Sequence, residues 1–562
     1  MSRRSAFALL ALAALLTHGP SAAAQATLVI RGRIWTGDPA HPWASALAVA
    51  GDTIAAIGDR ASVARLIGPA TEVVDAPGLV TPGLQDGHTH FIDGGFQLAS
   101  LDLRTVATPA EFIRRIRDFV RHVPKGKWII GGDWDHTLWP GQPLPRHEWI
   151  DSVTPDNPVF LERLDGHEAL ANAAAMRAAG ITRATAAPPG GEIGHDPRTG
   201  EPTGMFKDQA LRMVYGVVPD PTPEERDSAL VRALAYAASL GVTGTSSMWA
   251  SFADLQSFRR IERAGRLTMR AALYLPLEDW EAVADTIAAD GAGDDWVRIG
   301  GLKEFMDGSA GSRTAFFAEP YADSAGYRGL LRNRPADMAH WIGAADSVHL
   351  QVAVHAIGDS ANAILLGIYD SVTTAHGPRD RRFRIEHAQH LRPQDISRFG
   401  RLGVIASVQP YHLVDDGRWI QHRIGPVRIH STYPFRTLLD THAVLAFGSD
   451  WTVATLDPIQ GIAAAVTRRT SDGKNPGGWV PEQKITLSEA LRAYTWGNAY
   501  ANFTETHRGT LAPGKWADIT VLDKDLFTLP PAELGTARAV LTVVGGKVVY
   551  RRPGALLAHP RP

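Results

Sequence analysis

The feature that most constrains the fold is a regular alternation of short apolar runs with amphipathic stretches, between about residues 79 and 503. Runs of this length and composition are typical of strands buried on both faces, and the stretches between them have helical periodicity. Eight strands joined by helical crossovers predict an α/β fold, a (β/α)8 TIM barrel. The predicted strands cover residues 79–90, 241–248, 269–275, 297–305, 349–355, 382–387, 403–409 and 443–447.

Both ends of the chain have a different pattern. Residues 27–36 and 46–57 form Val- and Ile-rich runs separated by turn signals, and residues 518–522 and 539–550 repeat it near the other end. We therefore expect a small composite β-sandwich built from residues 27–78 and 504–552, beside a barrel of residues 79–503.

The connection between the first and second predicted barrel strands is unusually long. It spans roughly 150 residues, far beyond an ordinary loop. It is rich in tryptophan, including Trp128, Trp134, Trp139 and Trp149. We expect an inserted, lid-like subdomain at about residues 100–235, because lids over active sites are often built from such insertions.

Residues 1–26 have the pattern of a secretory signal peptide. Arg3 and Arg4 are followed by an apolar run over residues 6–16 and by small residues at 22–24. The apolar run is too short to span a bilayer. We expect a periplasmic or secreted protein without a membrane anchor.

The composition narrows the classes of partner and cofactor. The formal net charge is −2, which gives no indication of a nucleic-acid partner. The chain has no cysteine, so a metal would have to be held by histidine, carboxylate or a modified lysine, which favours a catalytic over a structural metal site.

The first candidate metal ligands lie in the segment LVTPGLQDGHTH, which ends at His88 and His90. Alternate side chains of an extended segment point to the same side, so these two imidazoles can grip one cation. A His-x-His pair alone is weak evidence, because two ordinary surface or core histidines fit it equally well.

Four further polar residues stand at or near the ends of later predicted strands: Lys303, His355, His387 and Asp450. The carboxyl ends of the strands meet at the face where barrel active sites form. Each residue alone has an ordinary structural interpretation, but their shared position at strand ends favours one site.

The complete set of motifs resembles the amidohydrolase superfamily of metal-dependent hydrolases. The motifs LKEFMDGSAGSRTA, VHAIGD, IEHAQ, SVQP and GSDW, together with HEALANAAAM, resemble the subgroup that contains N-substituted formamide deformylase. The resemblance covers nearly the whole chain after residue 26 and implies a barrel with a composite β-sandwich.

The resemblance also implies a ligand set. His88, His90 and Asp450 would bind one divalent ion, typically zinc, while His355 and His387 would bind a second. Lys303 would bridge the two ions if its amine captured carbon dioxide as a carbamate. An unmodified, charged Lys303 would instead leave a mononuclear site. Asp450 would also shuttle the catalytic proton.

Five residues are candidates for contact with a small-molecule substrate. An aromatic pocket wall is expected from residues after the last two barrel strands, whereas Arg313 fits a solvated loop charge as well as an anion contact, and a structural role is an equal alternative for His167. The candidates are His167, Arg313, Tyr411, His412 and Trp451.

The sequence therefore predicts a metal-dependent hydrolase of a carbon–nitrogen bond in an amide, N-acyl or N-formyl compound. An esterase, lactonase or carbamate hydrolase on the same site is the alternative within enzymes, and a non-catalytic binding protein is the alternative outside them. Related barrels often associate, so a homo-oligomer is also expected.

Overall fold

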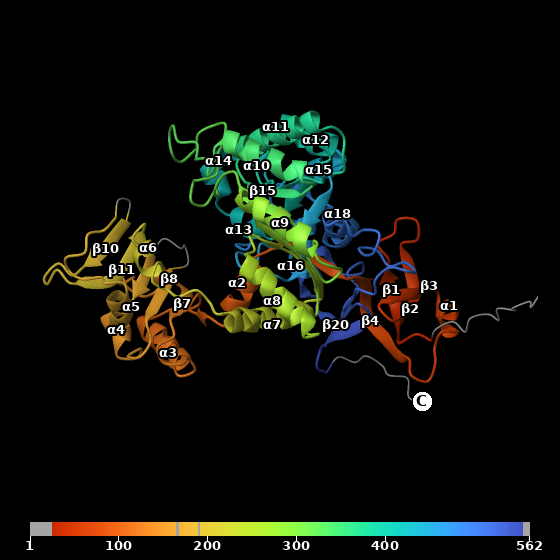
Figure 1. The fold of residues 1–562 in the computed structure, drawn as a ribbon, viewed down its shortest axis with the longest axis horizontal. Coiled ribbons are helices and arrows are strands. Elements are labelled where there is room, and N and C mark those ends of the chain that lie inside the picture. The colour runs from red at the N-terminus through yellow and green to blue at the C-terminus, as the bar shows by residue number, and fades with distance from the viewer. Residues whose placement is uncertain (1–24, 164–167, 189–190, 555–562) are drawn as a thin grey trace, which may run out of the picture.

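The computed structural model describes residues 25–163, 168–188 and 191–554, and the chain forms three regions, each built on its own sheet (Figure 1). The central region is an eight-stranded parallel sheet in which strands follow one another in chain order. Its strands are β5 (Leu84–Thr89), β12 (Val242–Met248), β13 (Arg270–Pro276), β14 (Val297–Phe305), β15 (Val352–Ala356), β16 (Arg384–His387), β17 (Ile405–Val408) and β18 (Leu445–Phe447).

A helix follows each barrel strand and packs on the outside of the sheet, which completes the barrel. α7 shows why the helices begin where they do: Thr222 and Glu225 form a capping box, and Pro223 occupies the first turn. The helices are α7 (Pro223–Ser239), α8 (Phe252–Arg263), α9 (Trp280–Asp290), α10 (Pro335–Ser347), α11 (Asp359–His376), α12 (Pro393–Leu402), α15 (Phe435–Asp440) and α16 (Pro458–Thr467).

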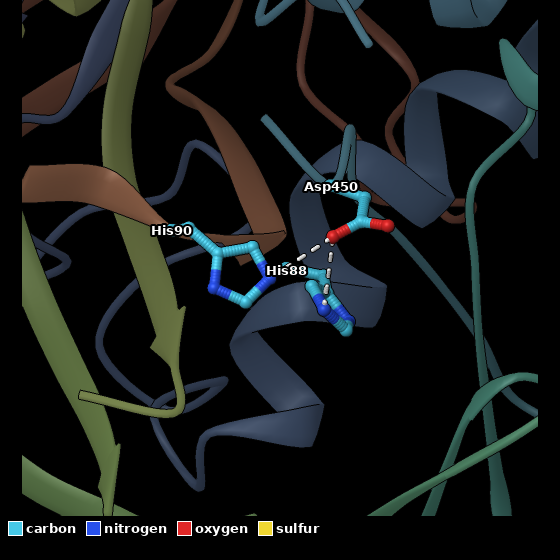
Figure 2. A group of neighbouring side chains, drawn as sticks. All are labelled: His88, His90 and Asp450. Atoms are coloured by element: carbon cyan, nitrogen blue, oxygen red, sulfur yellow. Dashed lines mark ion pairs between the residues drawn. The ribbon is translucent and has the colours of Figure 1, made fainter. Parts of the chain in front are cut away.

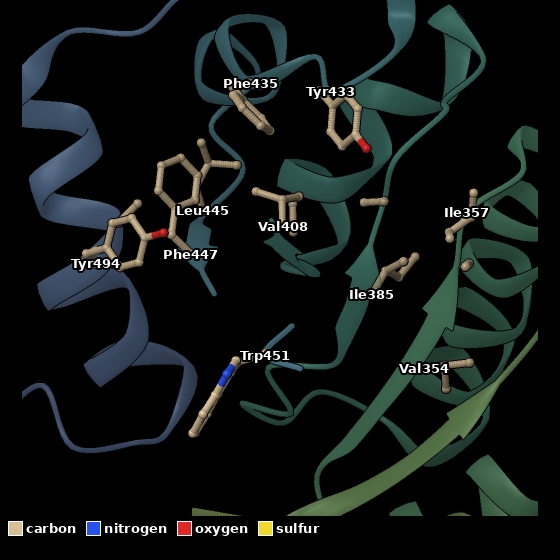
Figure 3. Packing of buried hydrophobic residues seen from close by; sticks show 14 of the residues in the cluster. Val354, Ile357, Ile385, Val408, Tyr433, Phe435, Leu445, Phe447, Trp451 and Tyr494 are labelled. Carbon is tan, nitrogen blue, oxygen red and sulfur yellow. The ribbon is translucent and has the colours of Figure 1, made fainter. Parts of the chain in front are cut away.

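The main hydrophobic core lies between the barrel strands and these helices. Figure 3 shows its residues around β15 to β18, with Val354, Ile385, Val408 and Phe447 pointing away from their strands into the helical layer. Shorter helices stand over the barrel ends: α2 (Phe91–Gln97), α13 (His412–Asp416), α14 (Ile420–Arg428), α17 (Leu487–Arg492) and α18 (Asn498–Ala501).

The two ends of the described chain share a seven-stranded sheet, as Figure 1 shows by the contact of its red and blue segments. Strand β19 pairs with β4, which joins the two ends. The sheet comprises β1 (Leu28–Trp35), β2 (Trp43–Ala50), β3 (Thr53–Gly58), β4 (Glu72–Pro82), β19 (Ile519–Leu522), β20 (Ala539–Val544) and β21 (Lys547–Arg551), with α1 (Arg60–Ala64) beside it. The predicted fold class is confirmed.

The insertion after β5 is a lobe with a six-stranded sheet and hydrophobic cores of its own. In Figure 1 it stands to one side of the barrel, attached by the segments before β6 and α7. It contains β6 (Leu101–Asp102), β7 (Ile129–Trp134), β8 (Val159–Arg163), β9 (Glu168–Ala171), β10 (Gly191–His195), β11 (Pro202–Asp208), α3 (Pro109–Val120), α4 (Glu148–Asp151), α5 (Ala173–Ala178) and α6 (Leu211–Tyr215).

Within the described residues, no helix combines the length and apolar character needed to cross a membrane.

Candidate metal centre

The barrel closes along a seam between β5 and the segment after β18, and this seam carries the first group of candidate ligands. The amide N–H of Asp450 donates to the carbonyl of His88 (2.8 Å), and that of His90 donates to the carbonyl of Trp451 (2.6 Å). The Asp86 carboxylate accepts hydrogen bonds from the backbone N–H groups of His88 and Ser449, each at 3.0 Å. Closing the barrel therefore also places the ligands.

His88, His90 and Asp450 converge at this seam (Figure 2). Asp450 Oδ1 lies 3.4 Å from His88 Nε2 and 3.3 Å from His90 Nε2. Two ligands of a tetrahedral zinc ion, each about 2.0–2.1 Å from the metal, stand roughly 3.4 Å apart. The three side chains are therefore spaced as metal ligands.

Buried partners fix the orientation of the His88 ring. Its Nδ1 lies 2.6 Å from Glu386 Oε2, an arrangement in which Nδ1–H donates to the carboxylate and Nε2 faces Asp450. Glu386 also accepts from Arg384 Nε (2.8 Å) and Ser407 Oγ (2.6 Å). Although burial alone would raise it, the pKa of Glu386 is lowered to about 2 by the Arg384 charge and by these hydrogen bonds.

A second group of candidate ligands shares Asp450. His387, at the end of β16, and His412, at the start of α13, each place a ligand atom within 4.8 Å of the others and of an Asp450 oxygen. His387 and Asp450 have positive φ angles of 74° and 59°. Such backbone strain is uncommon outside glycine and clusters at functional sites.

His355 adjoins this group, with its ring centroid 4.4 Å from that of His387. Its Nε2 lies 3.1 Å from the carbonyl oxygen of Gly308. With Nε2–H donating to that carbonyl, Nδ1 is the nitrogen left to bind a cation. Burial lowers the pKa of His355 to about 3, so the ring is neutral, as a metal ligand must be.

Lys303 is fully buried among these residues, and its amine makes no hydrogen bond within the described part of the chain. The Nζ atom lies 4.0 Å from the centre of the Phe305 ring. Burial lowers the pKa of Lys303 to about 8. About a tenth of the amine is therefore neutral at pH 7, and neutral amine is the form that reacts with carbon dioxide.

The donor set fits a divalent cation. Three imidazole nitrogens here are buried without a hydrogen bond to any described residue: His88 Nε2, His387 Nδ1 and His412 Nε2. Buried polar atoms left without partners cost folding free energy unless a ligand satisfies them. Imidazole and carboxylate ligands without thiolates suit a catalytic metal.

The other residues that the sequence predicted to contact substrate do not form one group in the structure. Arg313 forms an ion pair with Asp323 (2.9 Å), a partner it shares with Arg423, which agrees with the loop-charge interpretation. His167 lies outside the described residues. Tyr411 and Trp451, which adjoin His412 and Asp450 in the sequence, line a cavity of about 470 Å³ together with residues at the base of the inserted lobe.

The cavity is bordered by aromatic and acidic side chains. Trp451 is buried against Phe91 and Tyr236, with ring centroids 5.9 and 5.5 Å away. Leu98, Asp102, Arg104 and Asp133 line the side that belongs to the lobe and its connection. Tyr236, Tyr411 and Trp451 provide the aromatic side chains of this cavity, and contact of Tyr411 and Trp451 with a substrate stays a prediction.

Sequence reasoning missed Glu386, Arg384 and Asp307. Asp307 holds the loop after β14 against β15, because its carboxylate accepts from the N–H groups of Ile357 (2.9 Å) and Gly358 (2.8 Å). Burial raises its pKa to about 7. The available signal was a charged residue inside a strand-like run, such as Glu386 next to His387, which requires a buried partner.

Comparison with known proteins shows the family and the fold of this chain. The amidohydrolase family model matches residues 72–550, and the chain belongs to this family. Protein LONG AFTER FAR-RED 3 of Arabidopsis thaliana is 40% identical over 93% of this chain and 91% of its own length. N-substituted formamide deformylase of Arthrobacter pascens is 27% identical over 94% of this chain and 99% of its own.

The crystal structure of an uncharacterized metal-dependent hydrolase from Pyrococcus furiosus has the same fold, with a TM-score of 0.74 and 29% identity over 89% of this chain and 99% of that one. Family and fold together identify this protein as a metal-dependent hydrolase, and the superfamily indicated by the sequence motifs is confirmed.

Proposed function

We propose that the protein hydrolyses a carbon–nitrogen bond in a small amide, N-acyl or N-formyl compound. The observation that carries the proposal is the position of Asp450, whose carboxylate lies near both groups of imidazoles. The similarity to a relative named for deformylation of N-substituted formamides supports the type of bond.

His88, His90 and Asp450 would hold one divalent cation, and His355 and His387 a second. We propose zinc, because its ligands are nitrogen and carboxylate in such sites. When bound, the cations lower the pKa of water and polarise the substrate carbonyl.

Asp450 is the proposed general base and acid. It accepts a proton from the attacking water and returns it to the leaving nitrogen, because an amine leaves only when protonated. The neighbouring histidines lower the pKa of Asp450 well below its ordinary value in spite of burial, so the carboxylate is ionised and able to accept.

Lys303 is the proposed carbamate bridge. Its neutral amine adds to carbon dioxide, forming an N–C bond and releasing one proton. The product is anionic and offsets the charge of two adjacent cations, whereas the ammonium form would oppose them.

The leaving group is tested with matched substrates. N-formyl and N-acetyl derivatives of one amine are compared with the formate and acetate esters of the corresponding alcohol, using metal-loaded protein and an Asp450→Asn control. We expect the ratio of kcat/KM for the amide to kcat/KM for the matching ester to exceed the ratio of their uncatalysed hydrolysis rates. Turnover of the esters alone would instead assign an esterase, and no turnover of any carbonyl substrate would contradict the proposal.

We further propose that residues 1–26 direct export, on the basis of their basic, apolar and small-residue pattern. Cell fractionation followed by N-terminal sequencing of the protein tests this: retention of residues 1–26 in the cytoplasmic fraction would contradict it. Association into a homo-oligomer stays a prediction from the sequence.

A further inference from the structure

We propose that His412 is a ligand of the second cation, so that His387, His412 and the Oδ2 atom of Asp450 form a metal position opposite the one at His88 and His90. The inference rests on the proposed metal-dependent function. His412 follows β17, whereas the ligands indicated by the sequence motifs lie on or after other barrel strands.

The two oxygens of Asp450 face different imidazoles. Oδ1 lies 3.3–3.4 Å from His90 and His88, whereas Oδ2 lies 3.9 Å from His412 Nε2. One ligand atom each of His387, His412 and Asp450 lies within 4.8 Å of the other two. The Asp450 carboxylate therefore has one oxygen toward His88 and His90 and the other toward His412.

The nitrogens of the second cluster have no other use in the described structure. His412 Nε2 and His387 Nδ1 are both buried without a hydrogen-bond partner among the described residues. The two rings are nearly parallel, with an interplanar angle of 20° and centroids 6.2 Å apart. Both nitrogens are therefore available to bind a cation.

His412 is also held rigidly, as a ligand needs to be. Asp416, one turn later in α13, accepts hydrogen bonds from Gln389 Nε2 (2.8 Å) and Tyr433 Oη (2.6 Å). Gln389 lies only two residues after His387, so the same contact ties α13 to the loop that carries the other imidazole. Metal sites depend on such fixed placement of their ligands.

His355 remains compatible with this position through its Nδ1 atom. Its Nε2 is turned toward Gly308, and its ring lies against that of His387 on the side of β15. The proposal therefore predicts that His355 and His412 support one cation from two sides, while His88 and His90 support the other.

The test measures metal binding directly. The full-length protein is stripped with a chelator and titrated with Zn²⁺ by calorimetry, and bound metal is counted by elemental analysis. His412→Phe keeps an aromatic ring beside His387 but removes the ligand nitrogen, and His412→Ala removes both. His422→Ala, at an exposed histidine of α14, is the matched control for adventitious binding. Circular dichroism verifies that each variant is folded.

We expect two equivalents in the wild type and in His422→Ala. In both His412 variants the first equivalent should bind unchanged, while the second weakens at least about 100-fold, the upper end of the loss caused by removing partners of metal ligands. With Co²⁺ in place of Zn²⁺, the visible absorption of the second equivalent should change, because its coordination changes.

Two full equivalents with unchanged affinity in His412→Phe would overturn the inference and leave the proposed function intact, as would a wild type that binds only one equivalent. Loss of both equivalents in a folded His412→Phe protein would also overturn it, because the two positions would not be separable. A wild type that binds no metal would overturn the proposed function together with the inference.

Discussion

The two ends of the barrel differ in the partners of their buried polar and charged groups. At the amino-terminal end of the strands, Arg270 donates to Asp518 (2.9 Å), stands 3.9 Å from the centre of the Trp516 ring, and shares Asp518 with Arg508. At the carboxyl-terminal end, Lys303 and the facing nitrogens of three histidines are buried without hydrogen bonds to described residues.

The difference shows which end is built for stability and which for a ligand. The buried ion pair of Arg270 and Asp518 ties the terminal sheet to the barrel, because Asp518 precedes β19 and Arg270 begins β13. Unpaired buried donors raise the free energy of the folded protein until something binds them. Substitutions at the amino-terminal end should therefore lower stability more than activity. Substitutions at the carboxyl-terminal end should lower activity more than stability.

The largest expected effect is on activity, at Asp450. Asp450→Asn keeps the shape of the side chain but removes a charged ligand and the proposed proton acceptor. We expect kcat/KM to fall by about 10⁴-fold, at the upper end of general acid–base contributions. Steady-state kinetics on the best amide substrate measures this, with the unfolding temperature of the metal-free protein as a control. A loss below about tenfold would remove Asp450 from the chemistry.

The largest expected effect on stability is at the opposite end. Asp518→Ala leaves Arg270 and Arg508 buried without their carboxylate, and breaking a buried pair in this way costs about 3–5 kcal/mol. Denaturant unfolding measures the loss. Asp337→Ala breaks an ion pair of similar length whose arginine, Arg334, is exposed and whose aspartate is partly exposed, and it should cause little change. Equal effects of the two substitutions would refute the contrast between buried and exposed pairs.

Lys303→Met should abolish activity yet stabilise the metal-free protein. Burial lowers the Lys303 pKa from 10.5 to about 8, so charging this amine opposes folding. The penalty is complete below pH 8 and disappears as pH rises toward 10.5, so stability of the wild type increases with pH in this window. We expect Lys303→Met to gain about 1–3 kcal/mol at pH 7 and nothing above pH 10.5.

Melting temperatures across this pH range, in buffer free of carbon dioxide and metal, test the Lys303 prediction. Lys547→Met, at an exposed lysine of β21, is the matched control. If Lys303→Met were less stable than the wild type at pH 7, the prediction would be wrong. The amine would then make a stabilising interaction that is absent from the described contacts.

The smallest expected effect concerns Glu262 near the end of α8. Burial, followed by the neighbouring Asp294, raises its pKa to about 7. The folded protein therefore favours the protonated form, and stability falls as pH rises from about 4.5 to 7. Glu262→Gln should raise the melting temperature slightly at pH 8 and leave it unchanged at pH 4.5. Glu281→Gln, at an exposed residue of α9, should change neither value.

Much of the barrel could be predicted because its signals are local. The predicted strand at residues 297–305 coincides with β14, and the predicted strand at 382–387 ends with β16 at His387. The same local patterns placed Lys303, His355, His387 and Asp450 at the strand ends, where the structure brings them together with His88 and His90.

The inserted lobe could be recognised only by its length. Its sheet pairs strands that are far from one another in sequence, such as β9 with β11, and no short pattern reports that pairing. A lid role for the lobe stays a prediction: the lobe stands to one side of the barrel in Figure 1, and its residues Asp102 and Arg104 border the cavity.

The sequence by itself determined the family, the barrel and the candidate ligands, because strand ends and histidine spacing are properties of short segments. Only the tertiary structure decided which nitrogens are oriented by partners and which are left unpaired. Glu386 reaches His88 across nearly 300 residues of sequence, and His412 meets Asp450 only because β17 and β18 are neighbours. Closing the barrel brings these distant groups together, and that closure depends on packing that no local pattern contains.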